Sequence, residues 1–236
     1  MDFDFNFMGE ALISILPAVP MTILITGTTI VISLFFAVLL IYIRYYQIPL
    51  LRQLTAFYVS FFRGTPVMMH LLLVFYGLPY MIDYLAQSFG LSFQASSIPL
   101  CVLAIIAFSF SSTATFSEIL RAGILAISRG EIEAAYSIGM THWQTMWRII
   151  LPQAFVLSIP SLGSFCITIM QRSSLAFWIA VIEITGKANL IAADSYQFME
   201  AFIAAGFIYW TMTFVIEQIV RFIEKKHLST LRRGVV

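Results

Sequence analysis

Long apolar runs separated by short polar segments are the dominant pattern along this chain. A helix that crosses a bilayer needs about 20 mostly apolar residues. Five runs come close to that length, so the pattern predicts an all-α membrane protein with about five transmembrane helices. The predicted spans are residues 22–43, 55–78, 98–120, 155–171 and 198–220.

The first 20 residues are partly apolar but differ from a span. They carry Asp2, Asp4 and Glu10 and no Lys or Arg. A signal peptide needs a basic start, so this segment is not one. We expect a short helix that lies in the membrane interface and is broken near Pro17 and Pro20.

A further apolar run, residues 175–193, is interrupted by Glu183, Gly186 and Lys187. Such a segment is tolerated at membrane depth only where protein surrounds it. We interpret it as a short helix or re-entrant piece packed against the rest of the chain. Glu183 and Lys187 are four positions apart, the spacing at which opposite charges pair on a helix, and we expect them to pair.

Basic residues fall mostly on one side of the predicted bundle. If the five spans alternate in direction, ten of the 13 Lys and Arg residues lie on one side, two lie on the other, and Arg63 lies within a span. Cytoplasmic loops carry an excess of Lys and Arg, so the N-terminus is predicted outside and the C-terminus in the cytoplasm. The chain then divides into an extracytoplasmic interfacial segment (1–20), a transmembrane domain (20–222) with a cytoplasmic loop (121–152), and a basic cytoplasmic tail (223–236).

Composition agrees with a membrane protein. Hydrophobic residues make up 60% of the chain, charged residues 11%, and the mean hydropathy is +0.92, whereas soluble domains carry about a quarter charged residues. The net charge of +1 gives no sign of a nucleic-acid partner, and none is expected. Cys101 and Cys166 lie in apolar runs and are interpreted as packing residues, not as a disulfide or as metal ligands.

No catalytic motif stands out in the sequence. The nucleotide-binding pattern GxxxxGK[ST] is absent, and the only Gly-Lys pair, Gly186-Lys187, lacks the first glycine. There is no zinc-spaced His/Glu cluster and no nucleophile–base pair. We therefore expect no catalytic residues, no metal site and no enzymatic activity in this chain.

One polar segment, residues 129–154, interrupts the apolar pattern on the predicted cytoplasmic side. Residues 131–138 have a helical apolar edge, Gly139 is suited to end that helix in a left-handed turn, and Thr141 can cap a second helix. Pro152 fits the first turn of the following span. The pattern predicts a compact helix–turn–helix knob, although a helix that rests on lipid headgroups with its Trp side chains as anchors fits the periodicity equally well.

The spacing within this segment is more specific than its periodicity. Glu133-Ala134-Ala135, three residues, Gly139, nine residues and I-x-L-P resemble the signature of the inner-membrane subunits of ABC importers. "YVSFFRGTPVMMHLLLVFYGLP" and "EILRAGILAISRGEIEAAYSIG" are similar to blocks of the polar amino acid permease family. Residues 174–210 look most like its cystine-type members from Gram-positive bacteria, and the resemblance covers about residues 20–227.

The resemblance implies a type I ABC importer (MetI-like) fold in the bacterial cell membrane, and movement of a polar amino acid by alternating access. The implied partners are a cytoplasmic ABC ATPase dimer, a second permease subunit, an extracytoplasmic amino-acid-binding protein and membrane lipid. ATP and Mg²⁺ belong to the ATPase, and no cofactor is expected on this chain. The residues implied in ATPase docking are Glu133, Ala134, Ala135, Gly139, Met140 and Trp143.

Arg63 is the one basic residue that falls inside a predicted span. A charge at mid-bilayer usually faces protein or a cavity. The following Gly64-Thr65-Pro66 should open the helix locally. Arg63 then either faces the substrate pathway, where it could bind a carboxylate in a bidentate manner, or pairs with Glu118.

Hydroxyl groups are frequent in the predicted third span. Ser111, Thr115 and Glu118 share one helix face, with Ser112 beside it. This stripe is either part of a polar path for an amino acid or interhelical packing, in which Ser and Thr are common. The remaining candidates for the substrate pathway, at the outer end of the fourth span, are Gln171, Arg172, Ser173 and Ser174.

The cargo is predicted to be L-cystine, from the resemblance of residues 174–210; glutamine, glutamate and basic amino acids are the alternatives. Q-R-S-S-L at residues 171–175 departs from the K-D-T-S-L common in the family. Arg63 and Arg172 without a nearby Asp disfavour basic substrates, because like charges repel. An autonomous ion-coupled carrier is the rival from another class, but it would favour inverted repeats, and none is evident in the sequence.

Overall fold

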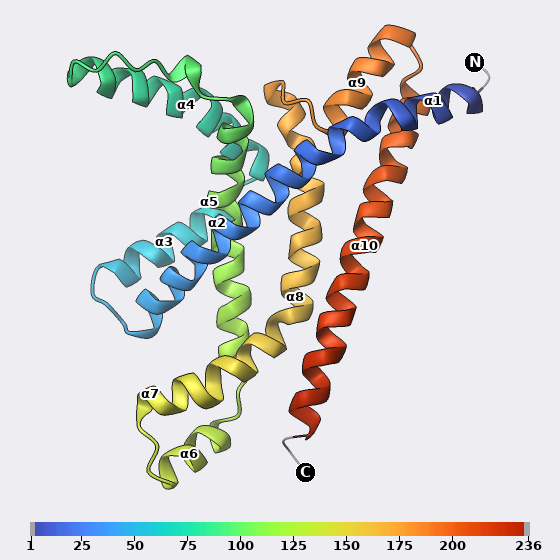
Figure 1. Ribbon diagram of the computed structural model, residues 1–236. Coiled ribbons are helices and arrows are strands. Elements are labelled where there is room, and N and C mark those ends of the chain that lie inside the picture. Colours follow the sequence, from blue (N-terminus) through green and yellow to red (C-terminus); the bar gives the residue numbers. More distant parts are fainter. Residues whose placement is uncertain (1–2, 234–236) are drawn as a thin grey trace.

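The computed structural model is an arrangement of long helices, several of which cross at steep angles (Figure 1). It describes residues 3–233, of which residues 227–233 are described by their backbone alone, and this range contains no β-strand. The α-helices are α1 (Phe5–Ile15), α2 (Val19–Tyr45), α3 (Leu51–Gly64), α4 (Val67–Ser88), α5 (Leu100–Leu125), α6 (Arg129–Ser137), α7 (His142–Thr145), α8 (Leu151–Arg172), α9 (Ile184–Ser195) and α10 (Phe198–Arg233).

Five helical stretches of the described residues are long and apolar enough to cross a membrane. They are Phe5–Tyr45, Val67–Ser88, Leu100–Leu125, His142–Ile179 and Phe198–Lys226. The predicted all-α class and the predicted number of spans are therefore confirmed, while the limits of several spans differ from the prediction.

The predicted span at residues 55–78 is wrong. The chain there forms two helices, α3 and α4, with Thr65 and Pro66 in extended conformation between them. Proline disfavours the helical region for the residue before it, and Thr65 accordingly has φ −120° and ψ 149°. The helix long enough to span is α4, and Arg63 lies in the last turn of α3 instead of inside a span.

The N-terminal helices form a nearly continuous rod. A 3₁₀ turn, Leu16–Ala18, separates α1 from α2, so the interruption predicted near Pro17 is present but does not end the helical path. Asp4 caps α1 by accepting hydrogen bonds from two backbone N–H groups, and α1 packs against α9 and α10. Asp2 lies outside the described residues, as do residues 234–236, and α10 continues without a break past the predicted boundary at residue 222.

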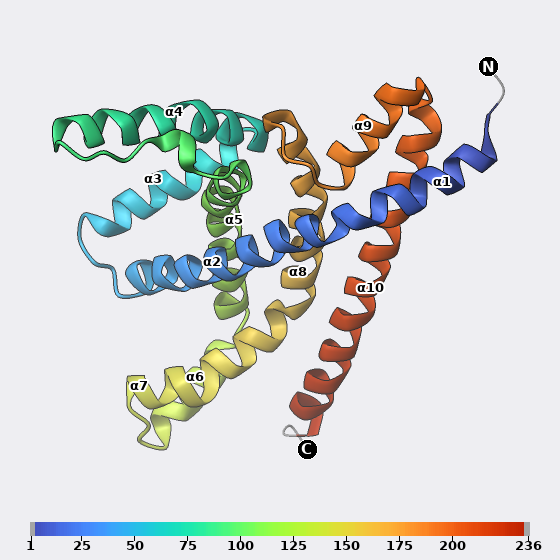
Figure 2. The same cartoon turned by 45° about the horizontal axis from the view of Figure 1, so that its top comes forward.

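α5 is the central helix and contacts α2, α3, α4 and α8 (Figures 1 and 2). Much of its buried face consists of small residues such as Ala107 and Ala114, which let neighbouring helices approach closely. At Gly123 a Cβ would collide with the Ser158 hydroxyl and the Ala154 carbonyl of α8. The α5–α8 crossing therefore requires glycine at this position, close to the start of the polar segment.

The polar segment leads into α8 without a gap. α7, a π-helical segment (Met146–Ile150) and α8 form one continuous stretch. Pro152 lies in the first turn of α8, as predicted; because the helical stretch is continuous through this point, its missing N–H leaves the helix one hydrogen bond short there. Any displacement of α7 therefore acts directly on a membrane-spanning helix.

The apolar run at residues 175–193 is short and packed against protein, as predicted. It contains a 3₁₀ helix (Ser173–Ile179), a left-handed residue at Ala180 and most of α9. Ile179, Ile184 and Ala188 are buried against other parts of the chain.

The expected pairing of Glu183 with Lys187 is wrong. Glu183 is fully buried and caps α9, accepting hydrogen bonds from the backbone N–H groups of Thr185 (3.0 Å) and Gly186 (2.9 Å). Its carboxylate also accepts a hydrogen bond from the Tyr209 hydroxyl in α10 at 2.6 Å. Local spacing could not reveal this arrangement, because Tyr209 is 26 positions away.

Burial raises the pKa of the Glu183 carboxyl. A raised pKa in the folded state means that the folded protein holds the proton more tightly than the unfolded chain, so stability is greatest below the ordinary Glu pKa and falls as pH rises through the raised value. We expect the melting temperature of the detergent-solubilised protein to fall over that window, and Glu183→Gln to flatten the dependence. Identical pH profiles for both proteins would contradict the assignment.

Candidate functional site

The polar segment forms a helical knob, residues 129–145, which contains α6 and α7 and protrudes at one end of the molecule (Figure 1). Gly139 joins the two helices with φ +82°, the left-handed conformation that glycine adopts at low cost. Thr141 and Gln144 form a reciprocal capping box at the start of α7. The predicted turn and cap are both confirmed, and together they fix the angle between the helices.

The predicted docking residues differ in their exposure. Glu133, Ala134, Gly139 and Trp143 are exposed, Met140 is half-buried and Ala135 is buried. Ala135 therefore packs within the knob, while its neighbours form the outer surface. The exposed large side chains around them are Tyr136, Ile138 and Trp147.

Histidine at the knob connects it to the membrane helices. His142 contacts the Tyr136 hydroxyl of α6 through Nδ1 and the Tyr45 hydroxyl of α2 through Nε2, both at 2.9 Å. Tyr45 and His142 also stack, with ring centroids 5.7 Å apart. Sequence reasoning missed this link, because the two residues are 97 positions apart and only the fold brings them together.

A second set of contacts holds the base of the knob. Ile127, Met146, Ile150 and Ala154 form a buried apolar cluster at the junction of the knob with α5 and α8. The Gln153 amide of α8 donates a hydrogen bond to the Glu131 carboxylate of α6 at 2.7 Å. The knob is therefore attached to α2 and α8 and packed against the end of α5. Attachments of this kind are what an element needs in order to transmit a displacement without deforming.

Glu118 of α5 is the centre of an arginine cluster, which consists of Arg44, Arg63 and Arg121 around its carboxylate. Arg121 donates to Glu118 Oε2 from Nε (3.1 Å) and Nη2 (2.7 Å), and Arg44 of α2 donates to Oε1. Arg63 of α3 lies 3.8 Å from Oε2 as an ion pair. One carboxylate thus joins three helices.

Arg63 is therefore paired with Glu118, the second of the two interpretations of this residue. Its guanidinium approaches Glu118 without a hydrogen bond, and its side chain is 53% exposed. An arginine carries five N–H donors, so Arg63 takes part in the cluster and keeps donors for another anion.

The hydroxyl stripe of α5 divides between buried and partly exposed positions. Ser111 and Ser112 are buried, whereas Thr115 and Glu118 are partly exposed. In this conformation the first two lie within helix packing, and Glu118 binds the arginines of the cluster.

The four pathway candidates at the C-terminal end of α8 lie toward the end of the molecule opposite the knob (Figure 1). Ser173 and Ser174 donate hydrogen bonds to the carbonyls of Met170 (2.6 Å) and Gln171 (2.7 Å). The Arg172 guanidinium lies over the Phe165 ring, 5.5 Å from its centroid. Gln171 is exposed, so it is the candidate most accessible to a molecule arriving at this end. Within the described residues no group of three or more His, Cys, Asp or Glu side chains has the arrangement of a metal site.

Comparisons with known proteins agree on one family. A family model described as binding-protein-dependent transport system inner membrane component matches residues 30–228. The probable amino-acid ABC transporter permease protein PatM of Vibrio harveyi is 37% identical over 226 residues, which cover 96% of this chain and 97% of that protein. The L-cystine transport system permease protein TcyL of Bacillus subtilis is 33% identical, with 95% and 91% covered. A crystal structure of an amino acid ABC transporter with histidines matches with a TM-score of 0.83 at 28% identity, covering 96% of this chain and 100% of that chain.

Proposed function

Because the chain belongs to the family of binding-protein-dependent transport system inner membrane components and is a permease subunit of an ABC importer for amino acids, we propose that it carries L-cystine under the control of an ATPase that docks on the knob. The observation that carries the proposed ATPase docking is the exposed, capped knob with direct attachments to α2 and α8. The choice of L-cystine rests on the similarity to the L-cystine permease TcyL. The chain itself is a transport subunit, and ATP and Mg²⁺ act in the partner.

Three partners complete the proposed importer in the cell membrane. A cytoplasmic ATPase dimer binds the knob, a second permease subunit supplies the other wall of the pathway, and an extracytoplasmic binding protein delivers the amino acid. Support for the second subunit comes from the small number of spans, because five helices are too few to enclose a solvated path. The proposed orientation places the N-terminus outside and the C-terminus and knob in the cytoplasm, in agreement with the distribution of Lys and Arg.

The knob offers a physical route for alternating access. Closure of the ATPase on ATP displaces the knob, and the His142–Tyr45 contact and the continuous α7–α8 stretch carry that displacement to α2 and α8. Glu118 couples α2 and α3 to α5, so the three helices move together while the arginine cluster is intact. Hydrolysis then returns the helices to their starting positions.

The proposed pathway runs past Arg63, Thr115 and Glu118, with Gln171 and Arg172 near its outer end. Arg63 has free donors for a substrate carboxylate. Ser111 and Ser112 are buried here, so they join the pathway only after the helices separate. An autonomous ion-coupled carrier, the rival function, would not need the exposed knob.

The cargo is tested by competition for uptake. Vesicles containing the importer and its own binding protein are given labelled L-cystine together with an excess of unlabelled L-cystine, glutamate, glutamine or arginine. We expect unlabelled cystine to suppress uptake at least tenfold more effectively than the other three, in agreement with the resemblance of residues 174–210 to cystine-type permeases and with the similarity to TcyL. If glutamate, glutamine or arginine competes most strongly, that amino acid and not cystine is the cargo. The assignment of the chain as an importer permease would not change.

A further inference from the structure

A basic cavity of about 460 Å³ opens between α2, α3 and α5 at the end of the molecule that carries the knob. Its polar lining comes from Arg44, Arg52, Arg121, Tyr45 and Gln47, and none of its lining residues is acidic. Gln47 accepts a hydrogen bond from Arg52 and donates one to the Arg44 carbonyl at 3.1 Å, which orders the α2–α3 loop along the rim.

The charge of this cavity is not balanced by the neighbouring carboxylate. Arg44, Arg52 and Arg121 line the cavity, and the neighbouring Glu118 carboxylate pairs with Arg44 and Arg121. Three positive charges against one negative charge leave an excess of two at this site. This excess of positive charge favours the binding of an anion, and the planar guanidinium group is well suited to hold a phosphate through paired hydrogen bonds.

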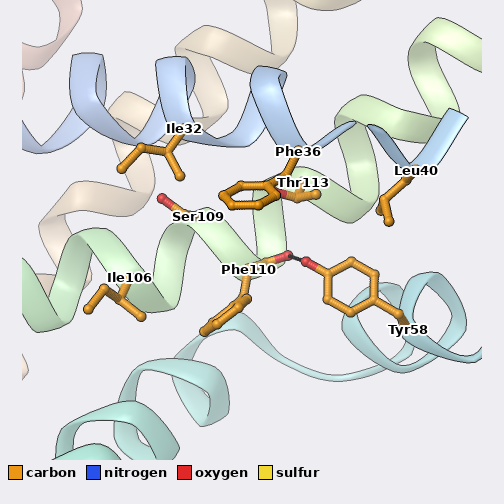
Figure 3. A pocket seen from close by; sticks show the side chains of 8 residues that line it. All are labelled: Ile32, Phe36, Leu40, Tyr58, Ile106, Ser109, Phe110 and Thr113. Carbon is orange, nitrogen blue, oxygen red and sulfur yellow. Dashed lines mark hydrogen bonds between the residues drawn. The ribbon is translucent and has the colours of Figure 1, made fainter. Parts of the chain in front are cut away.

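An apolar groove of about 330 Å³ lies between the same three helices (Figure 3). Its walls come from Ile32, Phe36 and Leu40 of α2, Tyr58 of α3, and Ile106, Ser109, Phe110 and Thr113 of α5, with Ser109 and Thr113 buried. The Tyr58 hydroxyl is already used, because it donates to the Phe110 carbonyl at 2.6 Å. The groove therefore presents almost only hydrocarbon to an occupant.

The two spaces follow one face of α2. Ile32, Phe36 and Leu40 line the groove, and Arg44, one turn after Leu40, lines the cavity. From Ile32 to Arg44 the helix advances by twelve residues, or about 18 Å at 1.5 Å per residue. A path of this length that changes from apolar to basic fits the acyl chain and the headgroup of one lipid molecule.

We propose that this combined site binds an anionic phospholipid of the cytoplasmic leaflet, with its phosphate in the basic cavity and one acyl chain in the apolar groove. Basic pockets between helices on the cytoplasmic side are suited to anionic headgroups. A polar amino acid is excluded as the occupant, because it has no hydrocarbon chain for the groove. The lipid contacts α2, α3 and α5, which Glu118 also joins, so its binding stabilises the arrangement of those helices independently of the cargo.

Native mass spectrometry of the intact importer in mild detergent tests this assignment. The probes are phosphatidylglycerol and phosphatidylethanolamine, added at equal concentration. We expect preferential retention of phosphatidylglycerol, reduced roughly fivefold by Arg52→Gln, in line with the contribution of one basic residue to anionic-lipid binding. Arg148→Gln is the matched control, since Arg148 is exposed at the same end but lies outside the site, and it should leave retention unchanged.

A second variant tests the groove without altering charge. Ile106→Trp fills the space between α2 and α5 and should displace the lipid while the complex remains assembled. Equal retention of the two lipids by the unmodified protein, or equal effects of Arg52→Gln and Arg148→Gln, would overturn the proposal. Unchanged lipid retention in Ile106→Trp, or displacement of the lipid by inorganic phosphate or glutamate, would also overturn the proposal. Efficient disulfide formation between two copies carrying Phe110→Cys would overturn it as well, because a second subunit would then occupy the groove.

Discussion

Glu133→Lys is expected to reduce ATP-driven uptake at least tenfold while the chain remains folded. Glu133 is exposed on α6 and belongs to the knob surface proposed to meet the ATPase. Charge reversal at a complementary interface places like charges together, which costs several kcal/mol, and 1.4 kcal/mol already corresponds to a tenfold loss of affinity. The measurement is copurification of the ATPase together with uptake into vesicles.

The matched control is Glu10→Lys. Glu10 is also an exposed glutamate on a helix, but it lies in α1, away from the knob (Figure 1). Uptake and ATPase copurification should be unaffected by that change. Wild-type uptake by Glu133→Lys would mean that the ATPase does not use this surface.

Glu118→Ala is expected to destabilise the protein by about 2 kcal/mol. Removing the shared carboxylate leaves Arg44, Arg63 and Arg121 next to one another without their common partner. Breaking a fully buried pair costs 3–5 kcal/mol; the expected loss here is smaller because the Arg63 and Arg121 side chains are 53% and 42% exposed. Thermal unfolding of the purified complex measures the effect.

Glu217→Ala provides the comparison for this experiment. Glu217 pairs with Arg221 at 3.4 Å on the exposed face of α10, with the two side chains 42% and 63% exposed. An exposed pair of this kind contributes about 0.3–0.5 kcal/mol, so its removal should barely change the unfolding temperature. Similar losses for the two variants would show that Glu118 does not join the helices as described.

Local signals in the sequence predict local structure well. Gly139 and Thr141 form the turn and cap of the knob as expected, because both effects depend on residues within a few positions. Apolar run length predicts the number of spans, since the bilayer sets that length. The prediction from run length fails at residues 55–78, because Pro66 restricts the backbone of Thr65 and breaks the helix despite the continuous apolar composition.

Contacts between distant segments could not be derived from spacing. Glu183 was expected to pair with Lys187 on the same helix, but the helix N-terminus and Tyr209 take its carboxylate. The His142–Tyr45 contact likewise depends on how the knob folds back against α2. Arg63 and Glu118 were recognised as possible partners because both are charges within apolar surroundings, whereas Arg44 completes the cluster only through the crossing of α2 over α5.

The most direct test of the account is the energy source for transport. Vesicles are prepared with the permease and its ATPase, or with the permease alone, in both cases with the binding protein on the side opposite the knob. Labelled amino acid uptake is followed with ATP on the knob side or with an ion gradient. We predict uptake only when both the ATPase and hydrolysable ATP are present. Uptake by the permease alone, driven by a sodium or proton gradient, would contradict the account.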